Sequence, residues 1–123
     1  MDDSEVHIRL AKEKRLAAIE EFRKQRYTVV ADLAIKAVEQ AIEAAAAKKY
    51  DMHFHLRPRE AHSKRREWVR ENFPDVARYM DELWGAYGAL GYEGVDGERA
   101  KKAVEAMERV LDEIGARAGI DFS

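Results

Sequence analysis

The chain has 123 residues, of which 37% are charged and 46% are hydrophobic, and its formal net charge at pH 7 is -2. This length fits one domain with a hydrophobic core of its own. The absence of cysteine excludes disulfides and thiolate chemistry. No apolar run approaches the roughly 20 residues of a membrane span, and the acidic first residues lack the apolar region of a secretory signal. We therefore expect a soluble, cytoplasmic protein.

The first predicted helix runs from about Ser4, a favourable N-cap residue, to about Gln25. Arg15 lies on the same face as the apolar residues of this helix. We expect it to form a structural ion pair with Glu39 or Glu43, or else to point into a pocket. The apolar residues on this face are Ile8, Ala11, Ala18, Ile19 and Phe22.

The second predicted helix, from about Thr28 to Lys48, follows a tight turn or kink near Arg26 and Tyr27. Its apolar residues recur at intervals of three and four, which predicts one continuous apolar face. Much of this face is alanine, so another helix can approach closely. The apolar face comprises Val30, Leu33, Ala34, Ala37, Val38, Ala41, Ile42 and Ala45. The opposite, polar face carries Asp32, Lys36, Glu39, Gln40 and Glu43.

Three further helices are predicted after a loop at residues 50–57. The third begins at Pro58, a residue suited to a first helical turn, and ends near Asn72. The fourth follows a turn at residues 73–75 and stops at Gly91. The fifth is capped by Asp96 and frays at Gly115 and Gly119. Because β-branched residues are sparse and the loops are short, the sequence predicts an all-α, up-and-down antiparallel bundle with four main helices and a short third one.

The segment from residue 48 to residue 70, which we call the basic segment, concentrates positive charge. It holds eight Lys and Arg against three acids, a net charge of +5, so the other residues carry -7. A basic patch on an acidic body indicates an anionic partner such as RNA, DNA or nucleotide phosphate, although a solvated helix face would have the same composition. The candidate phosphate-binding residues are Arg57, Arg59, Lys64, Arg65, Arg66 and Arg70.

The order of these elements resembles the HEPN domain family of small helical bundles. Three stretches carry the resemblance: the alanine-rich helix that follows Arg26 and Tyr27, the loop with histidine and arginine before a short third helix, and residues 91–100, which lead into a regular last helix. The resemblance covers residues 5–115. It implies a single HEPN-like helical domain over residues 1–123, a homodimer, association with RNA or nucleotides, and often a nucleotidyltransferase partner or a toxin–antitoxin context.

Some HEPN proteins are metal-independent ribonucleases that use an arginine followed four to six residues later by a histidine. Arg57 and His62 have this spacing, and they would be the catalytic pair, with histidine as general acid or base and arginine stabilising the phosphorane charge. The family motif lies just before the last long helix, however. Residues 84–92 occupy that place here and contain neither arginine nor histidine, which favours a non-catalytic, binding member.

The histidines of the loop allow two other interpretations. His53 and His55 follow Asp51 at spacings of two, so an extended loop would present three ligand-type side chains on one side, with His62 downstream. A solvent-facing loop explains the same pattern, and we assign no metal. Alternatively, His53 and His55 are polar contacts of a single-stranded RNA surface on which Phe54 stacks, unless Phe54 and Leu56 only pin the loop to the bundle.

The sequence therefore predicts a non-catalytic module that binds RNA or nucleotide phosphates through the basic segment, with no cofactor. The alternatives are a ribonuclease that uses Arg57 and His62, and a purely structural or antitoxin-like dimer. No glycine-rich phosphate loop, Ser/His/Asp set or Glu-x-x-His motif occurs. High charge, one asparagine and two glutamines are typical of thermophile proteins.

Overall fold

The computed structural model describes residues 3–93 and 97–123, together with their side chains except those of residues 3 and 86–93. Five α-helices and one short 3-10 helix make up these residues. They are α1 (Asp3–Arg23), α2 (Tyr27–Tyr50), η1 (Phe54–Leu56), α3 (Pro58–Asn72), α4 (Pro74–Glu93) and α5 (Gly97–Ala118). No strand occurs in the described ranges, and the predicted all-α bundle is confirmed.

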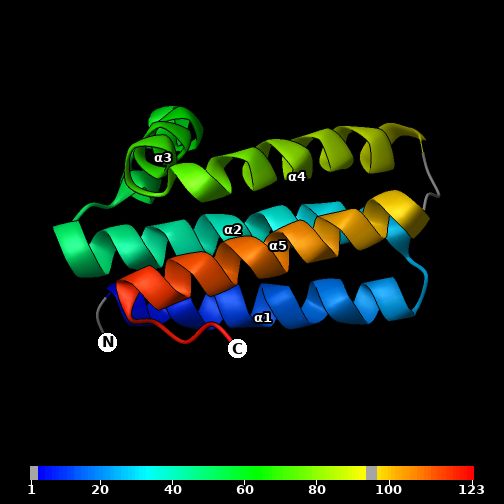
Figure 1. The fold of residues 1–123 in the computed structure, drawn as a ribbon, viewed down its shortest axis with the longest axis horizontal. Helices are drawn as coiled ribbons and strands as arrows, with labels where there is room; N and C mark the ends of the chain where they lie inside the picture. Colours follow the sequence, from blue (N-terminus) through cyan, green and yellow to red (C-terminus); the bar gives the residue numbers. More distant parts are fainter. Residues whose placement is uncertain (1–2, 94–96) are drawn as a thin grey trace.

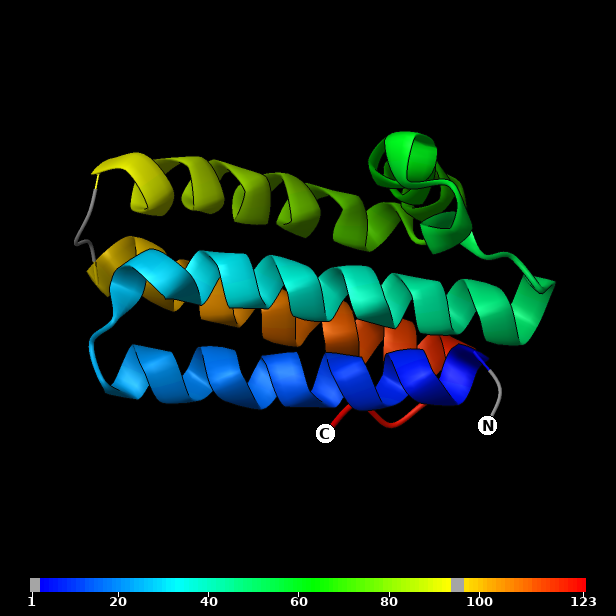
Figure 2. The same cartoon turned by 180° about the vertical axis from the view of Figure 1, so that it is seen from behind.

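The four long helices lie along one axis and alternate in direction, as expected for an up-and-down bundle (Figure 1). α2 lies in the middle, with α1 on one side and α4 on the other, and α5 packs beside it. The view from behind shows the same order (Figure 2). None of the helices in these ranges has an apolar stretch long enough to cross a lipid bilayer.

The core is built around α2, because alanine lets its neighbours approach closely. Ala34, Ala37, Ala41 and Ala45 have no exposed surface, and Ala11 and Ala18 of α1 are equally buried against them. The interface between α1 and α2 is the most extensive of the molecule. Larger side chains fill the other side of the core, among them Ile42, Leu83, Met107, Leu111 and Ile114.

Turns without glycine join the helices at two points. Gln25 takes a positive φ of 62° between α1 and α2, where the sequence predicts a tight turn or kink. Asp51 ends α2 with a φ of 53°, and the backbone N–H groups of Asp51 and Met52 donate to the carbonyls of Ala47 and Ala46. This left-handed cap turns the chain away from the bundle axis. α3 therefore runs across the bundle and is seen nearly end-on in Figure 1.

One predicted helix end is wrong, because α4 continues past Gly91 to Glu93. α5 runs through Gly115 and ends at Ala118, directly before Gly119, which is within the predicted end region. Gly115 leaves space for the residues after α5, because a Cβ at this position would lie 2.6 Å from the carbonyl oxygen of Ile120. The predicted cap at Asp96 lies outside the described residues, as do the side chains of Tyr87, Leu90 and residues 91–92.

Arg15 does form the expected ion pair, but not with the expected partners. Its guanidinium binds Glu108 and Asp112 of α5 and donates to the carbonyl oxygen of Phe122. Glu39 and Glu43 instead face α3, on the other side of α2. Arg15 thus ties α1 to the last helix and to the segment that follows it.

Candidate functional site

α3 presents three faces that differ in chemistry. Ala61 and Trp68 are buried, and Arg65, which lies on the same face, points toward α2. A second face is mainly acidic, with Glu60, Glu67 and Glu71. The third face carries Arg59, Arg66 and Arg70, which are seven and four residues apart and so line up along the helix. We call these three arginines the basic stripe.

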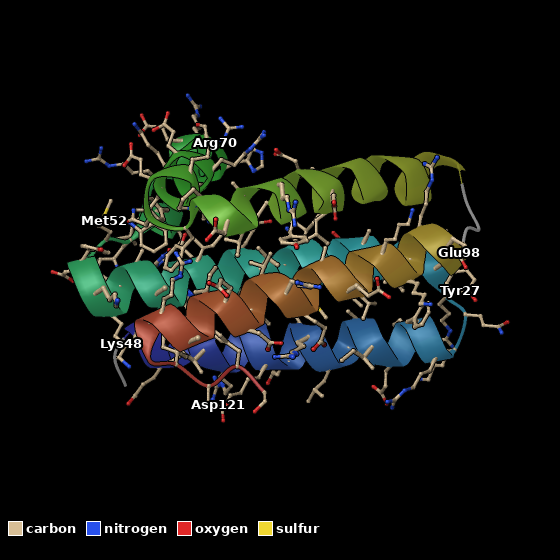
Figure 3. The ribbon with its side chains drawn as sticks, in the orientation of Figure 1. Tyr27, Lys48, Met52, Arg70, Glu98 and Asp121 are labelled. Atoms are coloured by element: carbon tan, nitrogen blue, oxygen red, sulfur yellow. The ribbon has the colours of Figure 1, made fainter. Side chains whose placement is uncertain are left out.

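The arginines of the basic stripe and the basic residues near them differ in whether a carboxylate binds them. Arg66 binds Asp81 at 2.9 Å, and Lys64 lies 3.6 Å from Glu67. Within the described residues, no ion pair involves Arg57, Arg59 or Arg70, and all three side chains are exposed. Figure 3 shows Arg70 on the side of α3 away from α1. Three of the six predicted phosphate contacts are therefore available without breaking an ion pair.

Arg65 lies in a different place from the other predicted phosphate contacts. Its Nε donates to Glu43 at 3.0 Å and its Nη1 to Glu39 at 2.6 Å, and only 12% of the side chain is exposed. Glu43 is itself 1% exposed, although it lies on the face of the second helix opposite the predicted apolar face. α3 and η1 cover that side. We therefore assign Arg65 the role of holding α3 to α2 rather than that of a phosphate contact.

Arg57 and His62, the predicted catalytic pair, form no hydrogen bond with each other within the described residues. Arg57 is the N-cap residue of α3 and has a non-helical backbone. The ring of His62 makes an edge contact with Trp84 of α4, with 4.4 Å between the ring centroids. His62 follows Arg59 by three residues and precedes Arg66 by four, so it lies beside the basic stripe.

The loop histidines lie close together but bind different carboxylates. His53 precedes the 3-10 helix η1, and its ring meets that of His55 edge to face, with 6.2 Å between the centroids. His53 binds Asp51, with 2.8 Å between Nε2 and the carboxylate oxygen. The Nδ1 of His55 instead lies 3.2 Å from Oε2 of Glu43. The predicted Asp51, His53 and His55 set therefore does not gather around one point, because His53 binds an exposed carboxylate and His55 a buried one.

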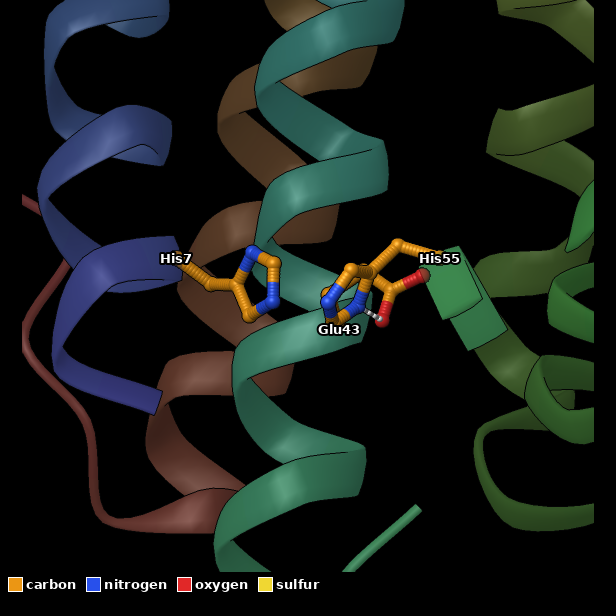
Figure 4. A group of neighbouring side chains, drawn as sticks. All are labelled: His7, Glu43 and His55. Carbon is orange, nitrogen blue, oxygen red and sulfur yellow. Dashed lines mark hydrogen bonds and ion pairs between the residues drawn. The ribbon is translucent and has the colours of Figure 1, made fainter. Parts of the chain in front are cut away.

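A third residue, His7 of α1, joins His55 and Glu43 (Figure 4). The rings of His7 and His55 meet edge to face, with 4.7 Å between their centroids. His7 is 6% exposed, and its Nδ1 lies 2.6 Å from Oε1 of Gln40. We call His7, Glu43 and His55 the His–Glu cluster. The sequence analysis missed His7, although it stands four residues before Ala11 and so extends the apolar face of the first helix.

No family model, curated protein or solved structure was found to match the chain.

Proposed function

We propose that the protein is a non-catalytic binding module that holds the phosphates of RNA or nucleotides on the outer face of α3. The observation that supports this most strongly is the basic stripe, in which Arg59 and Arg70 are exposed and form no ion pair within the described residues. Arginine guanidinium groups recognise phosphate through paired hydrogen bonds, and their charge attracts the nucleic acid backbone.

The dimensions of α3 suit an extended anionic ligand. Arg59 and Arg70 are eleven residues apart, which corresponds to about 17 Å along a helix. Arg57 adds a cation at the start of α3, and the rings of His62 and Trp84 lie beside the stripe, where a base could stack. A strand crossing this face would contact several cations in succession.

The first test measures binding of labelled single-stranded RNA in the presence of a chelator at several salt concentrations. Three phosphate contacts predict a slope of about -2 for log K against log salt, since each contact on a single strand contributes about -0.7. In the double variant Arg59→Ala/Arg70→Ala, affinity should fall and the slope should shrink to about -0.7. Competition by a nucleoside triphosphate distinguishes a free nucleotide from RNA as the preferred phosphate source.

The matched control is Arg9→Ala/Arg23→Ala, which removes the same charge from two exposed positions of α1, on the other side of the bundle. It should bind RNA as the wild type does. Equal losses in the two double variants would mean that net charge rather than the stripe governs binding, and the proposal would fail.

The ribonuclease alternative is tested in the same incubations by reading cleavage as well as binding. We expect intact RNA, because the ring of His62 packs against Trp84 and, within the described residues, forms no hydrogen bond with Arg57. Cleavage by the wild type that disappears in His62→Ala, with unchanged circular dichroism, would make the protein an enzyme and contradict the non-catalytic proposal.

The resemblance to HEPN domains supplies the rest of the proposal. It adds a second copy of the chain and a nucleotidyltransferase or antitoxin-like partner, while the cytoplasmic location is proposed from the composition of the chain. Light scattering at several protein concentrations tests the homodimer, and a monomer at all of them would remove that part. The purely structural alternative is left if neither binding nor cleavage of RNA is detected.

A further inference from the structure

The His–Glu cluster brings together ligand-type side chains from three elements that are far apart in the sequence. His7 comes from α1, Glu43 from α2 and His55 from η1, and one ligand atom from each lies within 4.8 Å of the others. A tetrahedral zinc ion, with ligands about 2.0–2.2 Å away, separates its ligand atoms by about 3.4 Å. Small rotations of the two imidazole rings would therefore close the set around one ion.

The hydrogen bonds behind the cluster orient these side chains as a metal site requires. The oxygen of Gln40 accepts a hydrogen bond when Nδ1 of His7 carries the proton, and in that tautomer Nε2 is the nitrogen that can bind a metal ion. Figure 4 shows the other nitrogen of His7 on the side toward Glu43 and His55. Glu43 is fixed from behind by Arg65. Metal-binding histidines and carboxylates typically have outer partners of this kind.

The charges around the cluster also favour a cation. Glu39 and Glu43 bring two negative charges to this region, and Arg65 supplies one positive charge to both. Glu43 is 1% exposed and shares Arg65 with Glu39, so a further positive charge beside these two carboxylates would be stabilising. The side chain of His55 is 36% exposed, which gives an ion a route from solvent and leaves room for a water ligand.

We propose that His7, Glu43 and His55 bind a divalent first-row transition-metal ion of the zinc class, which joins η1 to α1 and α2. Two imidazoles and one carboxylate match this class, whereas calcium and magnesium prefer ligand sets made of oxygen alone. The proposal concerns the inner side of η1 and does not depend on phosphate binding at the outer face of α3.

The test is calorimetric titration of the chelator-treated full chain with Zn²⁺, followed by thermal unfolding with and without the ion. We expect one ion per chain and a higher Tm when it is bound. His55→Ala and His7→Gln should each abolish the one-to-one binding and the rise in Tm. Gln40→Ala, which removes only the outer hydrogen bond of His7, should weaken binding about 10- to 100-fold.

Two other histidines provide matched controls. His62→Ala removes an exposed imidazole on α3 and should leave Zn²⁺ binding unchanged. His53→Ala tests the competing site in the loop, where His53 binds Asp51, and it should also leave binding unchanged. Circular dichroism of each apo variant separates loss of a ligand from loss of the fold, and the partly exposed His55 is the position at which substitution disturbs the core least.

Three results would overturn the proposal. The first is the absence of saturable binding to the wild type. The second is binding that His53→Ala removes and His7→Gln does not, since the loop would then hold the ion. The third is folded His55→Ala that binds Zn²⁺ as tightly as the wild type. A failure of RNA binding, in contrast, would leave this proposal untouched.

Discussion

Arg15 is a largely buried charge that joins the first helix to the last residues of the chain. Its side chain is 12% exposed and bonds to Glu108, to Asp112 and to the carbonyl oxygen of Phe122. The hydrogen bond with Glu108 and the two negative charges raise the pKa of Arg15, with burial opposing them. The arginine therefore stays charged at every pH at which the protein folds.

We expect Arg15→Met, which keeps most of the apolar stem, to lower the free energy of unfolding by about 1.5–3 kcal/mol, because hydrogen bonds to charged groups are lost. Urea unfolding measures the change. In a double-mutant cycle with Glu108→Gln, the two losses should sum to more than the loss in the double variant. Additive losses would show that packing of the stem, and not the ion pair, is what matters.

At the residue scale, the sequence predicts which side chains are unusual better than it predicts their partners. Arg15 was correctly expected to form an ion pair because a charge on an apolar face needs one, but the rotation of α1 directs it to α5 rather than to α2. Glu43 was placed on the polar face of its helix and considered as a partner of Arg15, because periodicity describes one helix at a time and does not show which element covers that face. α3 and η1 cover Glu43 because of the path of the loop between α2 and α3. The periodicity of a helix gives no information about that path.

Gly85 of α4 and Gly115 of α5 have opposite roles in the helices that contain them. Gly85 of α4 has nothing within 4 Å of the place where a Cβ would stand. A Cβ at Gly115 of α5 would lie 2.6 Å from the carbonyl oxygen of Ile120 and 3.3 Å from the ring of Phe122. The residues after α5 fold back on this glycine, as the N–H of Ile120 donating to its carbonyl oxygen also shows.

We therefore expect opposite effects from one substitution. Gly85→Ala should stabilise the protein by about 0.5–1 kcal/mol, because alanine is the better helix former. Gly115→Ala should destabilise it by about 1–3 kcal/mol, because the backbone of Ile120 must move. Thermal unfolding of the two variants, measured side by side, tests this, and a stabilising Gly115→Ala would show that the segment after α5 is free to shift.

At the element scale, the predicted helices are confirmed within a few residues, and α4 ends two residues beyond the predicted stop at Gly91. Amphipathic periodicity and Pro58 locate the beginnings well. Glycine is an ambiguous signal for a helix end. Gly119, with a φ of 68°, follows the end of α5 as expected, whereas Gly115 lies inside that helix and leaves space for Ile120.

For the molecule as a whole, the position of α3 depends on a few contacts with the bundle. Trp68 and Ala61 pack inward, and Arg65 joins two carboxylates of α2. The up-and-down arrangement of the four long helices follows from short loops and could be predicted. The crossing direction of α3 could not, since it depends on the left-handed conformation of Asp51 and on η1.

We expect Arg65→Met to lower stability by about 3–5 kcal/mol, because it leaves Glu43 buried without its counter-charge. Adding Glu43→Gln should recover part of this loss, since the uncompensated charge is then gone. Hydrogen exchange shows which helices lose stability in Arg65→Met. The amides of α3 should lose more protection than those of α1. Equal losses throughout the chain would mean that α3 is not a separately attached unit.

The alanine face of α2 has a consequence for which sequences this fold can accept. Side chains at the interface with α1 are already near the minimum size, so shortening them further removes little volume and little buried area. Because these alanines have no exposed surface, any longer side chain must displace neighbouring atoms of the core. Sequence drift along α2 is thus constrained in one direction: its central positions can exchange among the smallest residues, whereas each gain in bulk must be matched by a loss on the facing helix.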